Sequence, residues 1–243
     1  MLSKTEAQDA VIIALDMSRE EALELCDKLA GKARWVKVGM TLFYRYGPTI
    51  VDEMRERGFK VFLDLKLHDI PFQIRGAALS ASLCGADILS IHALGGADMI
   101  SQGREGTEEA AGMRGGNRTK LIAISVLTSM DQDALSSIGV SLPVEEEVSN
   151  LASLAVGAGA DGIVCSPQEA AAMRKLLGPE AIIVTPGIRP AGADVGDQKR
   201  ISTPSAAIAA GASKLVIGRP ITKADDPCEA FNAIICELMG LDV

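Results

Sequence analysis

The sequence predicts an α/β protein, a single (β/α)8 TIM barrel, and three observations lead to this fold class. Short apolar runs alternate with helix-like segments from one end of the 243-residue chain to the other. Aliphatic side chains must build the core, because 48% of the residues are hydrophobic but only 3% are aromatic; parallel sheets covered by helices have such cores. No linker-like stretch divides the chain, so residues 1–243 are expected to form one barrel domain.

Each expected strand is a mostly apolar run bounded by polar or turn-forming residues. The expected strands span residues 11–16, 35–40, 60–66, 87–93, 120–127, 162–166, 181–186 and 214–218. A doubly wound open sheet is the alternative. That fold usually has fewer strands and a glycine-rich first turn, and no GxGxxG follows the first run.

Capping residues mark where the helices begin. Ser18, with Glu21 three residues later, has the pattern of a capping box. Ser166 is expected to cap a helix whose first residue is Pro167. The other expected helices run to about residue 57 after the second strand, from Pro71 to about residue 84, over about 97–113 and 144–157, and from Thr203-Pro204 and Asp226-Pro227 onward.

A short motif recurs before three of the strands. The chain reads Cys-Gly-Ala-Asp at 84–87, Ala-Gly-Ala-Asp at 158–161 and Ala-Gly-Ala-Ser at 210–213. Glycine suits the left-handed residue at which a helix ends before the chain turns into the sheet. The repetition therefore supports a chain built from similar helix–strand units.

Composition excludes several classes of function. The formal net charge of −8 and the pI of about 4.9 argue against broad binding to nucleic acid or to anionic membranes. The N-terminus does not have the pattern of a signal peptide, and no apolar run is long enough to cross a bilayer. The cysteines are scattered and odd in number, without a CxxC pair, so reduced thiols in a cytoplasmic protein are expected: Cys26, Cys84, Cys165, Cys228 and Cys236.

The third expected strand carries an unusual concentration of charge. In the run FLDLKLHDIP, residues 62–71, an apolar stretch contains Asp64, Lys66, His68 and Asp69. Because alternate residues of a strand share a face, Asp64 and Lys66 are expected on the same side. A purely structural ion pair is one explanation. A further charge at the end of the same strand favours a functional site instead, since buried charges are costly unless they are paired or used.

In a (β/α)8 barrel the active site lies at the carboxyl ends of the strands. The polar residues expected there are Asp16, Lys37, Asp64, Lys66, Asp69, His92, Ser125, Thr128, Arg189, Gly218 and Arg219. The loops after the seventh and eighth strands often bind phosphate in such barrels. Here they supply Arg189 and Arg219 beside Gly187 and Gly218, and arginine and exposed backbone N–H groups both suit phosphate.

The loop over residues 186–200 is long, polar and glycine-rich, so it could close over a phosphate and place Gln198 above it. An ordinary mobile loop is the alternative.

Lysines and carboxylates alternate in the expected site, as Lys37, Asp64, Lys66 and Asp69. A lysine between carboxylates stays protonated and can donate a proton. Carboxylates beside a substrate anion favour a product that has lost its charge, so the array suits the replacement of a carboxylate by a proton. No HxH, HExxH or CxxC motif indicates a metal site, although Asp64 and Asp69 could bind Mg²⁺.

At these residues the sequence resembles the orotidine 5′-phosphate decarboxylase family over essentially the whole chain. The DxKxHDIP motif of that family is present at residues 64–71. Supporting matches are ALD ending at Asp16, VKVG with Lys37, HALGG from His92, SVLTS with Thr128, TPGIRP with Arg189, the loop Gln198, and IGRPI with Arg219.

The resemblance implies the decarboxylation of orotidine 5′-monophosphate to uridine 5′-monophosphate (UMP) and CO₂, the last step of UMP synthesis in pyrimidine biosynthesis. Lys66 would protonate C6 of the pyrimidine, and Asp64 and Asp69 would flank the departing carboxylate. It implies a homodimer in which Asp69 reaches the site of the partner subunit, with no cofactor, no metal and no partner beyond substrate and product. The substrate-binding set that it implies is Asp16, Lys37, Asp64, Ile70, Gln73, Thr128, Pro186, Arg189, Gln198, Gly218 and Arg219.

The chain departs from the family pattern after the motif, where Phe72-Gln73 replace a frequent Asn-Thr; this bears on the contact expected of Gln73. Two other functions are compatible with the same residues. One is a sugar-phosphate lyase that uses Mg²⁺ on Asp64 and Asp69, which two nearby ammonium groups disfavour. The other is a binding protein that keeps the pocket but turns nothing over. Decarboxylation of orotidine 5′-phosphate with and without EDTA distinguishes all three.

Overall fold

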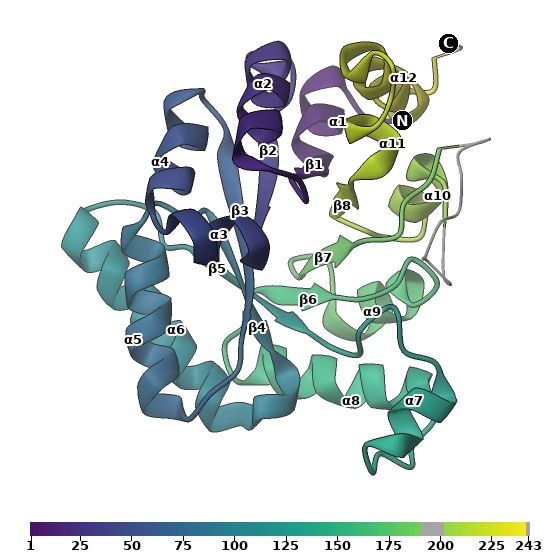
Figure 1. Ribbon diagram of the computed structural model, residues 1–243. Coiled ribbons are helices and arrows are strands. Elements are labelled where there is room, and N and C mark those ends of the chain that lie inside the picture. Colours follow the sequence, from purple (N-terminus) through teal and green to yellow (C-terminus); the bar gives the residue numbers. More distant parts are fainter. Residues whose placement is uncertain (191–201, 242–243) are drawn as a thin grey trace.

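The computed structural model describes residues 1–190 and 202–241, and in it eight parallel strands form a closed barrel. Each strand pairs with the next along the chain, and β8 closes the ring on β1, with Ile13 opposite Ile217. Helices surround the strands on the outside (Figure 1). The predicted single (β/α)8 TIM barrel is therefore confirmed. Within the described residues, no helix has the length and apolar character needed to cross a bilayer.

The strands lie where the apolar runs predict them. They are β1 Val11–Ala14, β2 Trp35–Gly39, β3 Lys60–Leu67, β4 Ile88–His92, β5 Lys120–Ile124, β6 Gly162–Val164, β7 Ile182–Thr185 and β8 Lys214–Ile217. All but β3 end earlier than predicted, by one residue at β2 and by three at β5. At those points the chain leaves the sheet and forms the loops of the barrel mouth, the end at which the carboxyl ends of the strands meet.

The helices are α1 Lys4–Ala10, α2 Arg19–Leu29, α3 Met40–Tyr46, α4 Thr49–Glu56, α5 Pro71–Leu83, α6 Gly96–Arg114, α7 Gln132–Ser137, α8 Val144–Gly157, α9 Ala170–Leu177, α10 Pro204–Ala209, α11 Arg219–Thr222 and α12 Pro227–Met239, with a 3₁₀ turn η1 at Ala93–Gly95. The capping box of Ser18 and Glu21 is present, and Thr203 and Asp226 cap α10 and α12. The sequence pattern does not predict the short helices α1, α7 and α11.

Two predicted helices differ from the structure. The helix after the second strand breaks into α3 and α4, because Gly47 takes a left-handed φ of 62° and Pro48 has no N–H to continue the ladder. The helix expected from Pro167 begins only at Ala170. Ser166 does not cap it; its backbone N–H instead donates to the Glu169 carboxylate at 2.8 Å, and the chain between them forms a turn.

The barrel interior is layered, because alternate strand residues point inward. A buried apolar layer fills the middle: Ile12, Trp35, Phe62, Ile88, Ile122 and Val184. Two residues further toward the mouth, the inward positions on four neighbouring strands are Lys37, Asp64, Ser90 and Ile124. The apolar layer therefore lies directly beneath Lys37 and Asp64 and closes the bottom of the site.

The recurring glycine motif has the predicted conformation. Gly85, Gly159 and Gly211 have φ values of 93°, 104° and 103°, all in the left-handed region that favours glycine. An arginine lies over each glycine and donates to its carbonyl oxygen, in the pairs Arg55–Gly85, Arg104–Gly159 and Arg174–Gly211. A Cβ on any of the three would press against the arginine stem.

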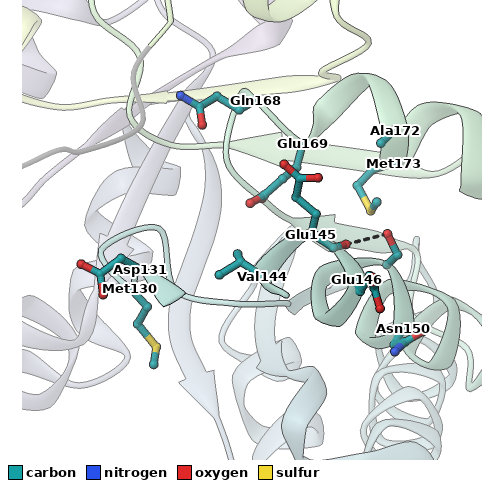
Figure 2. A pocket seen from close by; sticks show the side chains of 11 residues that line it. Met130, Asp131, Val144, Glu145, Glu146, Asn150, Gln168, Glu169, Ala172 and Met173 are labelled. Carbon is teal, nitrogen blue, oxygen red and sulfur yellow. Dashed lines mark hydrogen bonds between the residues drawn. The ribbon is translucent and has the colours of Figure 1, made fainter. Parts of the chain in front are cut away.

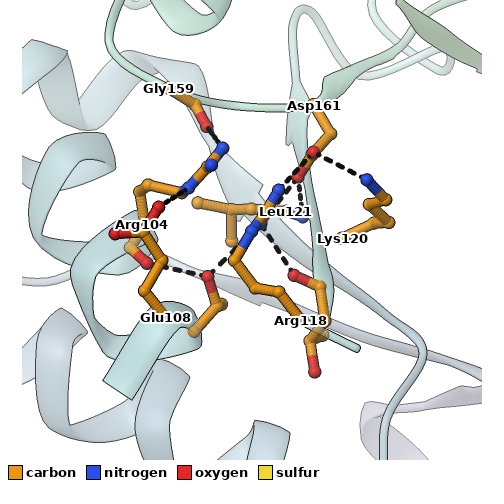
Figure 3. Close-up of polar contacts among 9 residues, drawn as sticks. Arg104, Glu108, Arg118, Lys120, Leu121, Gly159 and Asp161 are labelled. Atoms are coloured by element: carbon orange, nitrogen blue, oxygen red, sulfur yellow. Dashed lines mark hydrogen bonds and ion pairs between the residues drawn. The ribbon is translucent and has the colours of Figure 1, made fainter. Parts of the chain in front are cut away.

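The last residue of each motif ties two strands together at the end opposite the mouth. Its side chain accepts the N–H of a residue at the start of the preceding strand, in the pairs Asp87–Val61, Asp161–Leu121 and Ser213–Ile183, at 2.9, 2.8 and 3.1 Å. The Asp161 unit also includes Arg118 and Lys120 (Figure 3). The polar side chains at this end therefore stabilise the pairing of neighbouring strands. Those at the mouth have no such structural task in these units.

Candidate active site

Two adjoining cavities open at the barrel mouth. The outer cleft, of about 420 Å³, is lined by Ala14, Asp16, Lys37, Thr128, Pro186, Gly187, Arg189, Val216, Gly218, Arg219, Thr222 and Lys223. The inner pocket, of about 170 Å³, is lined by Lys37, Phe62, Asp64, Lys66, Ile124, Val126, Leu127, Thr128, Val164, Val184, Pro186 and Val216. Because both share Lys37, Thr128, Pro186 and Val216, they form one continuous site with a cationic outer end and a charged inner end.

Lysines and carboxylates alternate along one wall of this site. Lys37 Nζ lies 3.0 Å from Asp16 Oδ1 and 3.5 Å from Asp64 Oδ2. Lys66 Nζ lies 2.8 Å from the same Asp64 oxygen. Within one chain the array is therefore Asp16–Lys37–Asp64–Lys66, with Asp64 between two ammonium groups.

Asp64 is buried in the middle of this array. It is only 7% exposed, and burial alone would raise the pKa of its carboxyl group. The ammonium groups of Lys37 and Lys66, with hydrogen bonds from Lys66 and Ser90, outweigh burial and lower the pKa of Asp64 below its ordinary value. Asp64 therefore stays ionised at neutral pH, next to the pocket.

Asp69 does not join the array within the chain. It is exposed, and its carboxylate accepts the N–H of Ile70 at 2.6 Å; no ion pair links it to Lys66 in the part of the chain that the structure describes. Ile70 and Gln73 are also exposed and lie outside the linings of both cavities. The substrate contacts expected of these three residues remain predictions.

The outer end of the site contains the two predicted arginines. Arg189 is buried and Arg219 is exposed, and both line the outer cleft. Gly187 has a φ of 79°, so glycine is needed for the turn that leads to Arg189. The predicted contact of Gln198 lies outside the described residues.

Two histidines lie at the mouth beside the array. His68 and His92 stack with their ring centroids 5.5 Å apart. Burial first, and then the neighbouring His68 and Lys66, lower the pKa of His92. The side chain of His92 is therefore neutral at pH 7.

Sequence reasoning missed two residues of this site. Ser90 is fully buried and its hydroxyl donates to Asp64 Oδ1 at 2.8 Å. A Cβ on Gly39 would lie 3.2 Å from Lys37 Nζ and 3.3 Å from Asp16 Oδ1, so only glycine leaves this ion pair undisturbed. A single serine or glycine in a strand carries no sequence signal, but the inward period of β4, two residues beyond Ile88, could have indicated Ser90.

A larger cleft of about 640 Å³ lies to the side of the mouth, between the loop before α7, the start of α8 and the start of α9 (Figure 2). Its lining contains four acids, Asp131, Glu145, Glu146 and Glu169, and no lysine, arginine or histidine. Such a lining repels a phosphate. The smaller site at the mouth is therefore the better candidate for an anionic substrate.

Among the described residues, no group of three or more His, Cys, Asp or Glu side chains is arranged to hold a metal ion. At Asp64 itself, the two lysine ammonium groups would repel a divalent cation.

Comparisons with known proteins agree with the family that the residues of the site resemble. The sequence model of the "Orotidine 5'-phosphate decarboxylase / HUMPS family" matches residues 9–234. An orotidine 5′-phosphate decarboxylase from Cutibacterium acnes is 50% identical, over 92% of this chain and 93% of its own length. One from Parasynechococcus marenigrum is 47% identical, over 96% and 95%.

Solved structures of similar chains share the barrel. The crystal structure of orotidine 5′-phosphate decarboxylase from Lactobacillus acidophilus superimposes with a TM-score of 0.84 at 38% identity, covering 95% of this chain and 99% of that one. The crystal structure of the enzyme of the same name from Pyrococcus horikoshii, with a TM-score of 0.74 at 23% identity, shows the fold alone.

Proposed function

The chain belongs to the orotidine 5′-phosphate decarboxylase / HUMPS family and is a carboxy-lyase that converts orotidine 5′-monophosphate to UMP, and on that premise we propose how its own residues perform the reaction. One observation carries the proposal: an ionised, buried carboxylate between two ammonium groups lines an apolar pocket that continues into an arginine-lined cleft.

The substrate spans both cavities. Its phosphate lies in the outer cleft, held by Arg189, Arg219 and the backbone at Gly218. Asp16 and Lys37 hold the ribose hydroxyls, because their ion pair stands where the two cavities meet. The pyrimidine lies in the inner pocket against Thr128 and Pro186, between apolar walls that suit a flat ring.

The chemistry takes place at Asp64 and Lys66. The Asp64 carboxylate faces the substrate carboxylate, and the repulsion between them disappears when CO₂ departs as a neutral molecule. The bond between C6 and the carboxylate carbon breaks, and its electron pair stays on C6. The Lys66 ammonium stabilises that developing charge and then donates its proton to C6; solvent later returns a proton to Lys66.

Asp69 completes the array from a second copy of the chain in a homodimer. Its exposure, with its carboxylate away from the Lys66 ammonium of its own chain, supports this role. The side chains that follow it in the chain are also unusually apolar for a surface: Ile70 is 63% exposed and Phe72 80%. Such exposed apolar side chains are typical of a protein interface. We also propose that the enzyme acts in the cytoplasm, where it catalyses the last step of UMP synthesis.

Decarboxylation of orotidine 5′-phosphate by the purified chain, with and without EDTA, tests the proposed function. We expect UMP and CO₂ to form at equal rates in both reactions, because Lys37 and Lys66 provide the positive charge at the site. Loss of activity on chelation would instead indicate a metal-dependent lyase, and nucleotide binding without turnover would indicate a binding protein.

A further inference from the structure

We propose that Ser90, on β4, is a positioning residue that holds Asp64 and Lys66 together in their reactive geometry. The inference rests on the proposed function of these two residues. Ser90 itself faces the array from the neighbouring strand and is not among the residues that line the two cavities.

An interruption of the sheet brings Ser90 opposite the catalytic strand. Leu63 of β3 pairs with Leu89 of β4, but the next pair joins Leu67 to Ile91. Residues 64–66 therefore face a single residue, Ser90, and their backbone cannot follow the regular ladder of hydrogen bonds. Such a bulge re-aims the side chains of the bulged strand, and here these include Asp64 and Lys66.

Lys66 has a strained backbone at this bulge. Its φ is 53°, and among the described residues it is the only non-glycine residue with a positive φ. A long side chain in this region is unfavourable and persists only where surrounding contacts enforce it. Strain of this kind concentrates at functional sites, where it sets the direction of a reactive group.

The Ser90 hydroxyl supplies contacts that enforce this conformation. It accepts the backbone N–H of Lys66 at 2.8 Å and donates to Asp64 Oδ1 at 2.8 Å. With Oδ1 bound to Ser90, Oδ2 is left to face Lys66 Nζ at 2.8 Å and Lys37 Nζ at 3.5 Å. One hydroxyl thus fixes the orientation of the carboxylate and satisfies the backbone group that the bulge removes from the ladder.

The position of Ser90 also argues against a role in packing alone. It is 0% exposed and stands one inward step above Ile88 of the apolar layer, where the neighbouring strand β5 carries Ile124. An apolar side chain would pack there without the cost of burying a hydroxyl. The hydrogen bond from Ser90 also helps to lower the pKa of Asp64.

Steady-state kinetics of Ser90→Ala test the proposal. We expect kcat to fall about 10- to 100-fold, because the two hydrogen bonds of the hydroxyl are lost, while KM and the Kd for UMP change less than about threefold because Ser90 contacts neither ligand. Ser90→Thr keeps the hydroxyl and should recover most of kcat. The matched control is Thr119→Val, which removes another buried hydroxyl, bound to Ala86 O at 2.7 Å, at the opposite end of the barrel; its kcat should not change.

Hydrogen exchange of the Lys66 amide, measured by NMR, gives a readout that does not depend on activity. It should accelerate at least about tenfold in Ser90→Ala relative to wild type and Ser90→Thr, since the amide loses its acceptor. An unchanged kcat or unchanged exchange in folded Ser90→Ala would overturn the proposal. If the wild-type chain fails to decarboxylate its substrate, the proposed function fails, and the exchange experiment still decides whether Ser90 holds Lys66.

Discussion

Replacing Asp161 by asparagine tests how much the polar contacts at the end of the barrel opposite the mouth stabilise the fold. Asp161 accepts hydrogen bonds from two nitrogens of Arg118 and from the N–H of Leu121 at 2.8 Å, and Lys120 lies 3.4 Å away (Figure 3). The side chains of Asp161 and Arg118 are 11% and 15% exposed. Asparagine has the same shape, so the change removes charge and one acceptor without leaving a cavity.

The size of the effect follows from this geometry. The amide oxygen of asparagine can still accept from Leu121, but the amide nitrogen then faces an N–H of Arg118. One charge-assisted hydrogen bond, worth about 1.5–3 kcal/mol, is lost, and a second is weakened. We therefore expect the free energy of unfolding to fall by about 3 kcal/mol. This is less than the largest losses that follow when a buried ion pair is broken, because Arg118 keeps its hydrogen bond to Thr119 O. For a chain of this length the corresponding drop in Tm is roughly 6–12 °C.

The effect of pH on this difference has a definite sign. Burial raises the pKa of Asp161, but Arg118, the Leu121 N–H and Lys120 outweigh it, so the pKa of the folded carboxyl lies below its ordinary value. The stabilisation is complete above the unfolded pKa of about 3.9 and is lost as the pH falls through the lower folded value. The difference between wild type and Asp161→Asn should thus be constant near neutral pH and shrink below about pH 4.

Urea unfolding followed by circular dichroism, at several pH values, measures these differences. Asp87→Asn is the matched control, because Asp87 occupies the same place in its own unit but its pair with Arg55 is 30% and 44% exposed; it should lose at most about 1 kcal/mol. Equal losses in the two variants, or a loss in Asp161→Asn that does not change at acid pH, would refute the electrostatic reasoning.

Three further predictions concern the site. Arg219→Ala should lower kcat/KM for orotidine 5′-phosphate about 10²- to 10⁴-fold, because two charge-assisted hydrogen bonds to the phosphate are lost. Turnover of orotidine, which has no phosphate, should not change. Equal losses with both substrates would show that Arg219 does not bind the phosphate. Mixing inactive Lys66→Ala and Asp69→Asn chains should restore about a quarter of wild-type activity if sites form across a dimer, and no recovery would place Asp69 outside the partner's site. Gly39→Ala should lower kcat/KM roughly tenfold by displacing Lys37 and Asp16, with urea stability nearly unchanged; wild-type kinetics would show that the pair can adapt.

Local rules predict much of the fold. Apolar runs locate all eight strands, Ser18 and Asp226 cap helices as their sequence patterns require, and Gly85 and its counterparts are left-handed where helices end. The turn after Ser166 could not be predicted, because the capping pattern does not distinguish a helix from a turn closed by the Glu169 carboxylate.

The site was most predictable where residues carry charge. Lys37, Asp64 and Lys66 stand out because charges in apolar strands are costly, and the structure brings them together. The bulge that gives Lys66 its positive φ depends on pairing with β4, which no local pattern specifies. Asp69 belongs to the same sequence motif, but within one chain it does not join the array, and its proposed place beside Lys66 of a second chain stays a prediction.

The role of Lys66 is the central claim, and single-turnover decarboxylation by Lys66→Ala tests it most directly. We expect the rate to fall at least about 10²- to 10⁴-fold, as for loss of a general acid, while the Kd for UMP changes only a few-fold. Lys60→Ala, at the opposite end of the same strand and beside Trp35, should retain the wild-type rate. A Lys66→Ala enzyme that decarboxylates its substrate at a near wild-type rate would contradict the account.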